Sequence, residues 1–281
     1  MERASLYTSV TAYLAGASTV RTVRSTFNFE GNLRLRRRLQ RRLSRALGTR
    51  FISISASVEG TEWDRFRNPT TRIENWINLE KFRAPTDLER QGARRALDIP
   101  DDALAIATVG NCSPIKNHAA LLKALALVKD YPWVWIHVGA EDNDATEKAL
   151  ARQSGVIASC RFQGRSDPLL ALHAADLYAM PSLYEGLGMA TVEALATGLP
   201  ALLTDVAGNK DLADITDSIT WSAPDSQSLS QGLVRAFNTV HQADRQGAIE
   251  SQCAAVAARF SPERGVADYA AVYRDVIRGR D

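Results

Sequence analysis

Cysteine is scarce in this sequence: the 281 residues include only Cys112, Cys160 and Cys253, far apart and without a Cys-x-x-Cys pair. Disulfide-stapled miniproteins need a dense and even set of cysteines, so that class is excluded and free thiols are expected. Long apolar runs are also missing, since no stretch approaches the about 20 apolar residues of a membrane-spanning helix. With 45% hydrophobic and 23% charged residues, the composition excludes collagen and disordered chains. We expect a cytoplasmic globular protein of one large or two modest domains.

The amino terminus allows two interpretations. Residues 1–18 carry Arg3 and a mildly apolar stretch ending in LAGAS, which resembles a secretory signal with its cleavage site. Polar residues interrupt this stretch at Thr8, Ser9, Thr11 and Tyr13. We therefore favour a short amphipathic helix over 6–16 that turns at Gly16 into a strand at 18–23, and a signal peptide remains the alternative.

Positive charge gathers in the first third of the chain. Residues 1–83 hold 16 Lys and Arg against 7 Asp and Glu, a net charge of +9. Residues 84–281 hold 18 against 25, a net charge of −7. Much of the basic excess lies in one short segment, at Arg34, Arg36, Arg37, Arg38, Arg41, Arg42 and Arg45.

Leu35, Leu39 and Leu43 recur every four residues among these arginines, which predicts an amphipathic helix with a narrow apolar stripe. One interpretation is a solvated basic face above a stripe that packs on the core. The other is attraction to an anionic membrane or a phosphate-bearing lipid. No aromatic residue interleaves the arginines and no nucleic-acid-binding motif accompanies them, so we expect no nucleic acid partner.

From residue 84 onward, short apolar runs alternate with helix-length segments. Strands are predicted at 104–110, 133–139, 160–164, 176–182, 200–205 and 218–222. Helices are predicted at 87–103 (stopped by Pro100), 117–130, 144–155, 168–175 and 189–198. This alternation is typical of βαβ units and predicts a complete doubly wound parallel sheet. Residues 1–83 add strands at 18–23 and 50–55, the two helices above and the segment 71–82, which is the closing part of another α/β unit with a connector.

Ligands of doubly wound sheets bind at the carboxyl ends of the strands, so the loops there are candidates for a site. One loop follows Val109-Gly110, holds a Ser113-Pro114 turn and carries Lys116 near the start of a helix. A lysine beside free amides at a helix N-terminus suits an anion. From this loop alone, a solvated lysine beside a helix cap is the alternative.

A second loop follows Ser182, where Gly186 and Gly188 permit a close backbone approach just before a helix. The amides and the positive dipole end of that helix would face a ligand phosphate. Glu185 and Glu193 would be about 12 Å apart on a helix, so they more plausibly hold different parts of one extended ligand than share a proton. A nucleotide sugar fits, with one carboxylate on the ribose hydroxyls and one on the sugar.

The segment PSLYEGLGMATVEALATGLPALLTDVAG resembles the signature of the family-4 (group 1) glycosyltransferases of the GT-B fold, in which two glutamates are separated by seven residues. Glu185 and Glu193 match that pattern. Residues 109–125 resemble the family's first donor-phosphate loop, and residues 160–182 its base-binding strand with the helix that follows. Residues 72–82 resemble the interdomain connector, with Trp76 in place of the usual glycine.

The resemblance implies a GT-B-like α/β fold with a complete Rossmann-like donor domain at 84–262. It also implies a partial, acceptor-side Rossmann-like domain at 1–83 and a helix at 263–281 that crosses back to it. The implied catalytic residues are Glu185, Lys116 and Arg24. The implied donor-binding residues are Gly110, Asn111, Lys116, Phe162, Gly164, Arg165, Glu185, Gly186, Leu187, Gly188, Met189, Ala190, Thr191 and Glu193.

Within that set, the resemblance places Lys116 on the diphosphate, Glu193 on the ribose and Glu185 at the sugar. It implies a UDP- or GDP-sugar as co-substrate, retention of configuration and no metal or other cofactor. Double displacement through Glu185 is an alternative mechanism. His173 and His241 are expected on helices, with no partner at metal-ligand spacing, and we expect no metal ligands. His118 is expected to help cap the phosphate loop, and His137 to be a core residue.

Three features depart from the family pattern. Asn111 stands where the family often has an arginine beside the diphosphate, a loss for which Arg161 or Arg165 could compensate. Arg24 stands where the family has a catalytic histidine, and no histidine precedes His118. The first strands of the family's amino-terminal domain have no counterpart, so we expect an N-terminally truncated member.

The resemblance implies a glycosyltransferase that moves a sugar from a nucleotide-sugar donor to a glycan or lipid-linked acceptor. Its role would be the synthesis of a cell-surface polysaccharide, lipopolysaccharide or glycolipid, with the basic helix Arg34 to Arg45 in peripheral contact with the inner face of the plasma membrane. One alternative is a nucleotide-sugar-binding, catalytically impaired chain or one subunit of a two-chain transferase, which Arg24 favours. A nucleotide-sugar epimerase of the same architecture is a further alternative.

Overall fold

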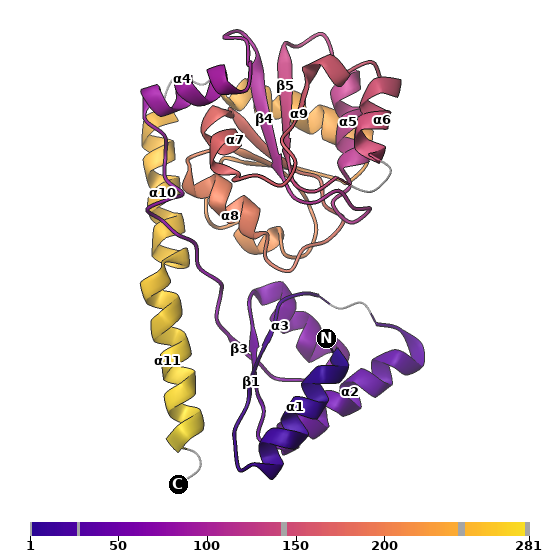
Figure 1. Ribbon diagram of the computed structural model, residues 1–281, viewed down its shortest axis with the longest axis vertical. Coiled ribbons are helices and arrows are strands. Elements are labelled where there is room, and N and C mark those ends of the chain that lie inside the picture. Colours follow the sequence, from indigo (N-terminus) through magenta and orange to yellow (C-terminus); the bar gives the residue numbers. More distant parts are fainter. Residues whose placement is uncertain (1, 27–28, 142–144, 241–244, 279–281) are drawn as a thin grey trace. The chain divides into compact units, whose positions relative to one another are not determined.

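The computed structural model describes residues 2–26, 29–141, 145–240 and 245–278 (Figure 1). The contacts within it divide the chain into two units. The first contains residues 1–76, 185–187 and 260–281, and the second contains residues 77–184 and 188–259. These dividing points lie near the predicted domain limits at 83 and 262 without coinciding with them. Asp144, the first residue of one predicted helix, and His241 lie outside the described residues.

Six parallel strands form the sheet of the second unit, in the order β6-β5-β4-β7-β8-β9. They are β4 (Leu104–Val109), β5 (Trp133–Val138), β6 (Cys160–Phe162), β7 (Leu177–Met180), β8 (Ala201–Thr204) and β9 (Ile219–Ser222). In chain order this is the 3-2-1-4-5-6 arrangement of a doubly wound sheet. The predicted α/β fold class, with its doubly wound parallel sheet, is therefore confirmed.

Helices cover both faces of this sheet (Figure 1). The helices of this unit are α4 (Asp87–Ala96), α5 (His118–Leu127), α6 (Thr146–Gln153), α7 (Leu169–Ala174), α8 (Met189–Ala196), α9 (Ser226–Val240) and α10 (Arg245–Phe260). Ile106 of β4 lies in an apolar cluster with α5 and α9, whereas its neighbour Ala105 lies in a second cluster with α4 and α7. Because both faces are covered, the strands are apolar at nearly every position.

Helix α4 is shorter than the predicted span 87–103. Thr86 and Glu89 form a capping box at its start. The helix ends at Ala96 rather than at Pro100, because Asp98 adopts a left-handed backbone conformation with φ 49°. The Ile99 amide then donates back to the carbonyl of residue 94 at 3.0 Å, which closes the helix end.

The first unit contains a sheet of three parallel strands, β1 (Val20–Val23), β2 (Arg50–Ser53) and β3 (Thr71–Arg72). Its helices are α1 (Glu2–Leu14), α2 (Gly31–Ala46), α3 (Ala56–Phe66) and α11 (Pro262–Arg278). Helix α3 was not predicted from the sequence. Its available signal is Ser55, whose hydroxyl accepts a hydrogen bond from the Val58 amide, and the helix ends where Arg67 turns left-handed.

Helix α2 contradicts the prediction of an apolar stripe that packs on the core. Leu35, Leu39 and Leu43 are 67%, 65% and 45% exposed, whereas Arg41 is fully buried. The leucine stripe therefore faces away from the core of the first unit. Among the described residues, no helix has both the length and the apolar character needed to cross a bilayer.

The connector residue Trp76 packs on helix α11. Its ring lies edge-on to Tyr269, with ring centroids 5.8 Å apart, and a Cβ added to Gly265 would collide with the indole. The Tyr269 hydroxyl lies 2.8 Å from Thr22 Oγ1 at β1. These contacts give the tryptophan at this position a packing role in the first unit.

Candidate functional site

The loops that follow β4, β5 and β6 are hydrogen-bonded to one another at the carboxyl edge of the six-stranded sheet. Gly139 N donates to the Gly164 carbonyl at 2.8 Å, and Ala140 N donates to the Asn111 side-chain oxygen at 2.8 Å. Gly139 approaches Gly110 so closely that a Cβ on Gly139 would collide with the Gly110 carbonyl oxygen. Three predicted donor-binding residues, Gly110, Asn111 and Gly164, thus lie at this edge.

Lys116 lies against Gly110. A Cβ added to Gly110 would be 3.3 Å from the Lys116 Cε, so the lysine stem occupies the space above that glycine. The Lys116 amide donates to the Ser113 carbonyl at 3.0 Å, which forms the predicted turn. Helix α5 then begins at His118, directly after Asn117, whose backbone is left-handed with φ 57°. The structure thus places Lys116 at the predicted position, beside a helix N-terminus.

Two hydrogen bonds join this loop to the loop that leads toward α8. The Leu183 amide donates to the Ile115 carbonyl at 2.8 Å, and the Asn117 side-chain nitrogen donates to the Pro181 carbonyl at 3.0 Å. The candidate phosphate loop and the glycine-rich loop are therefore fixed to each other within the second unit. The sequence placed both loops at the carboxyl edge but could not show this direct connection.

Gly188 stands at the N-terminus of helix α8, where main-chain amides lack intrahelical partners. A Cβ on Gly188 would be 3.0 Å from Thr191 Oγ1 and 3.6 Å from Asn209 Oδ1. Both oxygens are buried and have no hydrogen-bond partner among the described residues. Buried oxygens in this state indicate a place that a polar ligand can satisfy. Asn209 was missed by the sequence analysis, because it lies 16 residues beyond Glu193 and outside the signature's two glutamates.

Met189 and Ala190, in the first turn of α8, and Glu193, one turn further on, are half-buried. Burial raises the pKa of Glu193; the positive charge of Lys81 lowers it and Asp167 raises it. Lys81 Nζ and the Asp167 carboxylate lie 2.8 Å apart, so they form an ion pair near Glu193. Glu193 is therefore a partly desolvated carboxylate rather than an exposed helix residue.

The tip of the glycine-rich loop belongs by its contacts to the first unit. It comprises Glu185, Gly186 and Leu187. The Ser55 hydroxyl donates to the Gly186 carbonyl at 2.6 Å, and a Cβ on Gly186 would collide with the Arg24 carbonyl oxygen. The Arg24 side chain is exposed directly after β1. The roles implied for Glu185 and Arg24 remain predictions.

Phe162 and Arg165 lie at or after the end of β6. The Phe162 ring is half-buried and packs edge-on to Trp135, with ring centroids 5.5 Å apart, and Arg165 is exposed. Arg161 cannot compensate for Asn111. Its guanidinium donates to the Leu97 carbonyl at 3.0 Å and to three further main-chain carbonyls, those of Asp98, Ala158 and Cys160.

The structure also assembles a cluster that the sequence did not predict. The thiol of Cys112 and one ring nitrogen each of His118 and His137 all lie within 4.8 Å of one another. Burial, then the neighbouring His118, lowers the pKa of His137 to about 4. Burial raises the pKa of the adjacent Glu147, but its interactions with His118 and Cys112 outweigh this and lower that pKa to about 2. No local motif connects these residues, because they come from four separate segments. Cys112 lies in the loop after β4, His118 at the start of α5, His137 on β5 and Glu147 on α6.

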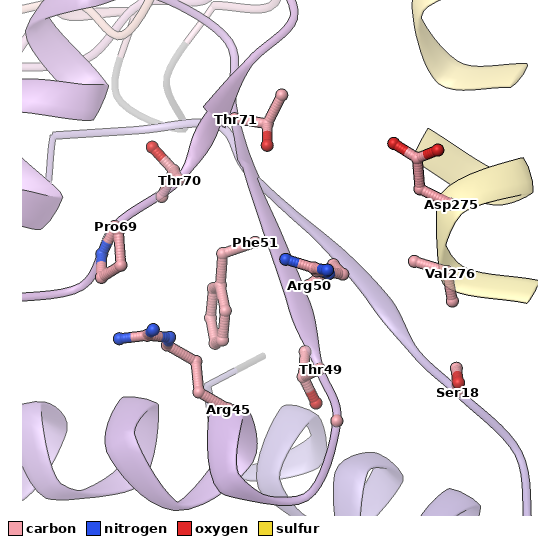
Figure 2. A pocket seen from close by; sticks show the side chains of 11 residues that line it. Ser18, Arg45, Thr49, Arg50, Phe51, Pro69, Thr70, Thr71, Asp275 and Val276 are labelled. Atoms are coloured by element: carbon pink, nitrogen blue, oxygen red, sulfur yellow. The ribbon is translucent and has the colours of Figure 1, made fainter. Parts of the chain in front are cut away.

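A hollow of ≈410 Å³ lies in the first unit, near the amino ends of β2 and β3 (Figure 2). Arg45, Arg50 and Asp275 contribute charged side chains to it, as Figure 2 shows. None of the residues proposed for donor binding lines this hollow. Ligands of such sheets bind at the opposite, carboxyl edge, so the hollow is not the candidate site.

Comparison with known proteins agrees with the fold. The chain is 30% identical over 212 residues to the D-inositol 3-phosphate glycosyltransferase of Corynebacterium urealyticum, a match that covers 71% of this chain and 49% of that protein. The chain thus spans about half the length of this relative.

Two solved structures resemble the fold of this chain. Anabaena HepE in complex with UDP and glucose matches with a TM-score of 0.82 and 18% identity, over 98% of this chain and 76% of that chain. WaaG, a glycosyltransferase involved in lipopolysaccharide biosynthesis, matches with a TM-score of 0.69 and 22% identity, over 85% of this chain and 70% of that chain. The family model of the glycosyl transferases group 1 matches residues 89–245. Since that model covers more than half of the chain, including both loops at the carboxyl edge, the protein belongs to the group 1 glycosyl transferases.

Proposed function

We propose that the protein transfers a sugar from a UDP- or GDP-sugar to a glycan or lipid-linked acceptor. The observation that carries this proposal is the direct hydrogen bonding between the Lys116 loop and the loop leading to α8, through Leu183 with Ile115 and Asn117 with Pro181. It joins a cationic side chain to the loop that ends at a helix N-terminus, and both suit a diphosphate. The UDP complexes of the HepE structure support a nucleotide-sugar donor.

The proposed roles follow from chemistry. Lys116 and the amides of Gly188 to Thr191 bind the diphosphate, Glu193 accepts hydrogen bonds from the ribose, and Glu185 faces the sugar. In the reaction, the bond between the sugar's anomeric carbon and the diphosphate oxygen breaks, and the nucleoside diphosphate leaves with the electron pair. The acceptor's hydroxyl oxygen forms the new bond, and its proton is released. Lys116 and the α8 dipole stabilise the charge on the leaving group, so the proposal needs no metal ion in the transfer itself.

We propose retention of configuration, with the acceptor attacking from the face that the diphosphate leaves. A double displacement, with the Glu185 carboxylate as nucleophile, gives the same stereochemical result through a covalent intermediate. Trapping or failure to trap a glycosyl group on Glu185 distinguishes the two routes. Anomeric analysis of the product tests retention itself.

The donor site is tested by calorimetric titration of UDP, GDP and ADP, each with its common sugar conjugates, in the presence of a chelator. We expect saturable binding of one nucleotide by the wild type and an affinity at least about tenfold lower, or ~1.4 kcal/mol, in Glu193→Ala. Lys116→Met should weaken binding of the diphosphate forms, whereas the matched control Lys123→Met, on the exposed face of α5, should not. If the folded wild type binds none of these nucleotides, the proposal is wrong.

A turnover assay separates transfer from binding alone. Release of the nucleoside diphosphate in the presence of lipid-linked or glycan acceptors would support the transferase. Saturable donor binding without release would favour the alternative, a catalytically impaired chain or one subunit of a two-chain transferase. The exposed Arg24, in place of the family's histidine, is the feature that favours this second candidate.

We also propose that the protein acts in the cytoplasm and contacts anionic membrane through α2. The exposed Leu35, Leu39 and Leu43 stand among arginines on that helix, and this combination suits an interfacial helix. Sedimentation with anionic lipid vesicles should show binding that falls with salt, because charge attraction is screened. Leu39→Ser should weaken binding, whereas Leu88→Ser, at an exposed leucine on α4, should not. Equal binding by both variants would contradict the proposal.

A further inference from the structure

Three segments that are separate in the sequence bring metal-binding side chains together beneath the loop at 110–116. Cys112 lies in that loop, His118 is the first residue of α5, and His137 lies on β5. The thiol sulfur and one nitrogen of each ring lie within 4.8 Å of one another, and the Cys112 sulfur is 3.9 Å from His137 Nε2. The two imidazole rings have centroids 4.8 Å apart. These distances place all three ligand atoms around a single point.

The two histidines are buried with unused nitrogens. His118 is 1% exposed, and neither of its ring nitrogens has a hydrogen-bond partner in the part of the chain that the structure describes. His137 is fully buried; its Nε2 lies 2.8 Å from the Gly110 carbonyl, and its Nδ1 has no partner among those same residues. Buried polar atoms without partners are costly, and their presence at one place indicates a ligand that uses them.

The electrostatic environment suits a divalent cation. Glu147 is 7% exposed, and one of its oxygens lies 3.7 Å from His118 Nδ1, too far for a hydrogen bond. A Cys112 thiolate and the Glu147 carboxylate together would balance a double positive charge. A carboxylate beside a metal-bound histidine orients the ring and raises its basicity. Cys112 is only half-buried, so it leaves the ion a path from solvent.

We infer that Cys112, His118 and His137 bind a divalent transition metal ion of the zinc type, with Glu147 as a positioning residue. Thiolate sulfur and imidazole nitrogen are the ligands that such ions prefer, and alkaline earth ions would instead need oxygen ligands. On binding, the Cys112 thiol releases its proton to solvent, and each neutral histidine binds the ion through a ring nitrogen that carries no hydrogen. The ion ties the loop after β4 to α5 and β5. None of its ligands is a residue proposed to bind the donor, so this inference does not depend on the proposed transfer reaction.

The site is tested with Co²⁺ as a spectroscopic probe on untagged, chelator-treated protein. We expect one equivalent of Co²⁺ to bind with a thiolate-to-metal charge-transfer band, and Zn²⁺ to displace it. Cys112→Ser should remove that band, whereas the matched control Cys253→Ser, at another half-buried thiol, should keep it. Glu147→Gln should retain the band but bind about 10- to 100-fold more weakly.

Circular dichroism shows whether each variant is folded, so loss of the band can be separated from loss of structure. Zinc should also raise the melting temperature of the wild type and of Cys253→Ser, but not of Cys112→Ser. The inference is overturned if the folded wild type binds neither Co²⁺ nor Zn²⁺ saturably. It is equally overturned if the charge-transfer band persists in Cys112→Ser.

Discussion

The Arg41 guanidinium and the Glu62 carboxylate form a paired, two-bond contact inside the first unit, with N···O distances of 2.7 and 2.8 Å. Both side chains are buried, at 0% and 1% exposure. The Asn68 side chain donates a further hydrogen bond to Glu62 at 2.7 Å, and the Arg41 guanidinium lies 4.0 Å from the centroid of the Phe66 ring. This pair connects α2 to α3, and it explains how one arginine of a basic helix comes to face inward.

Replacing Glu62 by Gln should destabilise the protein strongly, because it leaves the buried Arg41 charge without its counterion. The expected loss is about 3–5 kcal/mol in the free energy of unfolding. The same change at Glu59, a half-buried residue on the same helix with a loose ion pair to Arg72, should cost less than about 1 kcal/mol. Urea denaturation followed by circular dichroism measures both. Equal losses in the two variants would contradict a special role for the buried pair.

The fold of the second unit could be predicted because its signals are local and repeated. Apolar runs such as 104–110 and 133–139 alternate with helices. A parallel sheet whose two faces are both covered by such helices is a doubly wound sheet. The places of Lys116 and Glu193 in the fold could also be predicted, because Lys116 precedes the start of a helix and Glu193 lies in the helix that follows the glycine-rich loop. Their roles in binding stay predictions. The predictions that were wrong, and the residues that were missed, depend on packing between segments that are distant in the sequence.

Arg41 illustrates such a failure. Leucines at every fourth position allow the interpretation that they pack on the core, whereas in the structure Arg41 faces inward and pairs with Glu62 on α3. Arg161 was a plausible substitute for a missing arginine, but two of its carbonyl partners, Leu97 and Asp98, lie directly after α4 and more than 60 residues away in the sequence. Asn209 and the Cys112 cluster were missed for the same reason. Each of these residues has partners that are distant in the sequence and that only the fold brings close.

Gly139→Ala should destabilise the carboxyl edge of the sheet in the second unit. The added Cβ would collide with the Gly110 carbonyl, and Gly139 has φ 156°, which favours glycine. Gly155→Ala is the matched control, because its φ of 71° also strains an L residue while the space around it is open. Backbone strain alone costs about 1–3 kcal/mol, so the control should lose that amount and Gly139→Ala more. Thermal unfolding measures the difference, and comparable losses would show that the loop relaxes freely.

Replacing two helical glycines by alanine, one at a time, should change the melting temperature in opposite directions. Gly265→Ala on α11 forces the Trp76 indole to move, because the new Cβ would overlap the ring. Gly60→Ala on α3 meets nothing within 4 Å, so it should stabilise the helix by up to about 1 kcal/mol. The expected signs are a lower melting temperature for Gly265→Ala and a higher one for Gly60→Ala. Near-ultraviolet circular dichroism should also change in Gly265→Ala, since Trp76 lies against Tyr269.

Because of Glu193, the affinity for the nucleotide should depend on pH. The change should occur at a higher pH than the one at which an ordinary glutamate titrates. Burial raises the pKa of Glu193 above its usual 4.5, so the carboxylate that would accept the ribose hydroxyl hydrogens is lost at a higher pH than an exposed glutamate would require. Affinity for the nucleotide should therefore fall as the pH falls through that raised pKa.

In the absence of ligand, the contribution of Glu193 to the stability of the fold has the opposite dependence on pH. The folded state binds the Glu193 proton more tightly than the unfolded state, so the stability that this group contributes is present below the unfolded pKa and is lost as pH rises through the folded pKa. Glu193→Gln should be at least as stable as the wild type at pH 7, and its nucleotide affinity should be lower there and flat across the range in which the wild type changes. Calorimetric titration and thermal unfolding between pH 4 and 8, at roughly unit steps, measure both effects. A wild-type affinity that is as flat as that of Glu193→Gln would show that this carboxylate does not contact the nucleotide.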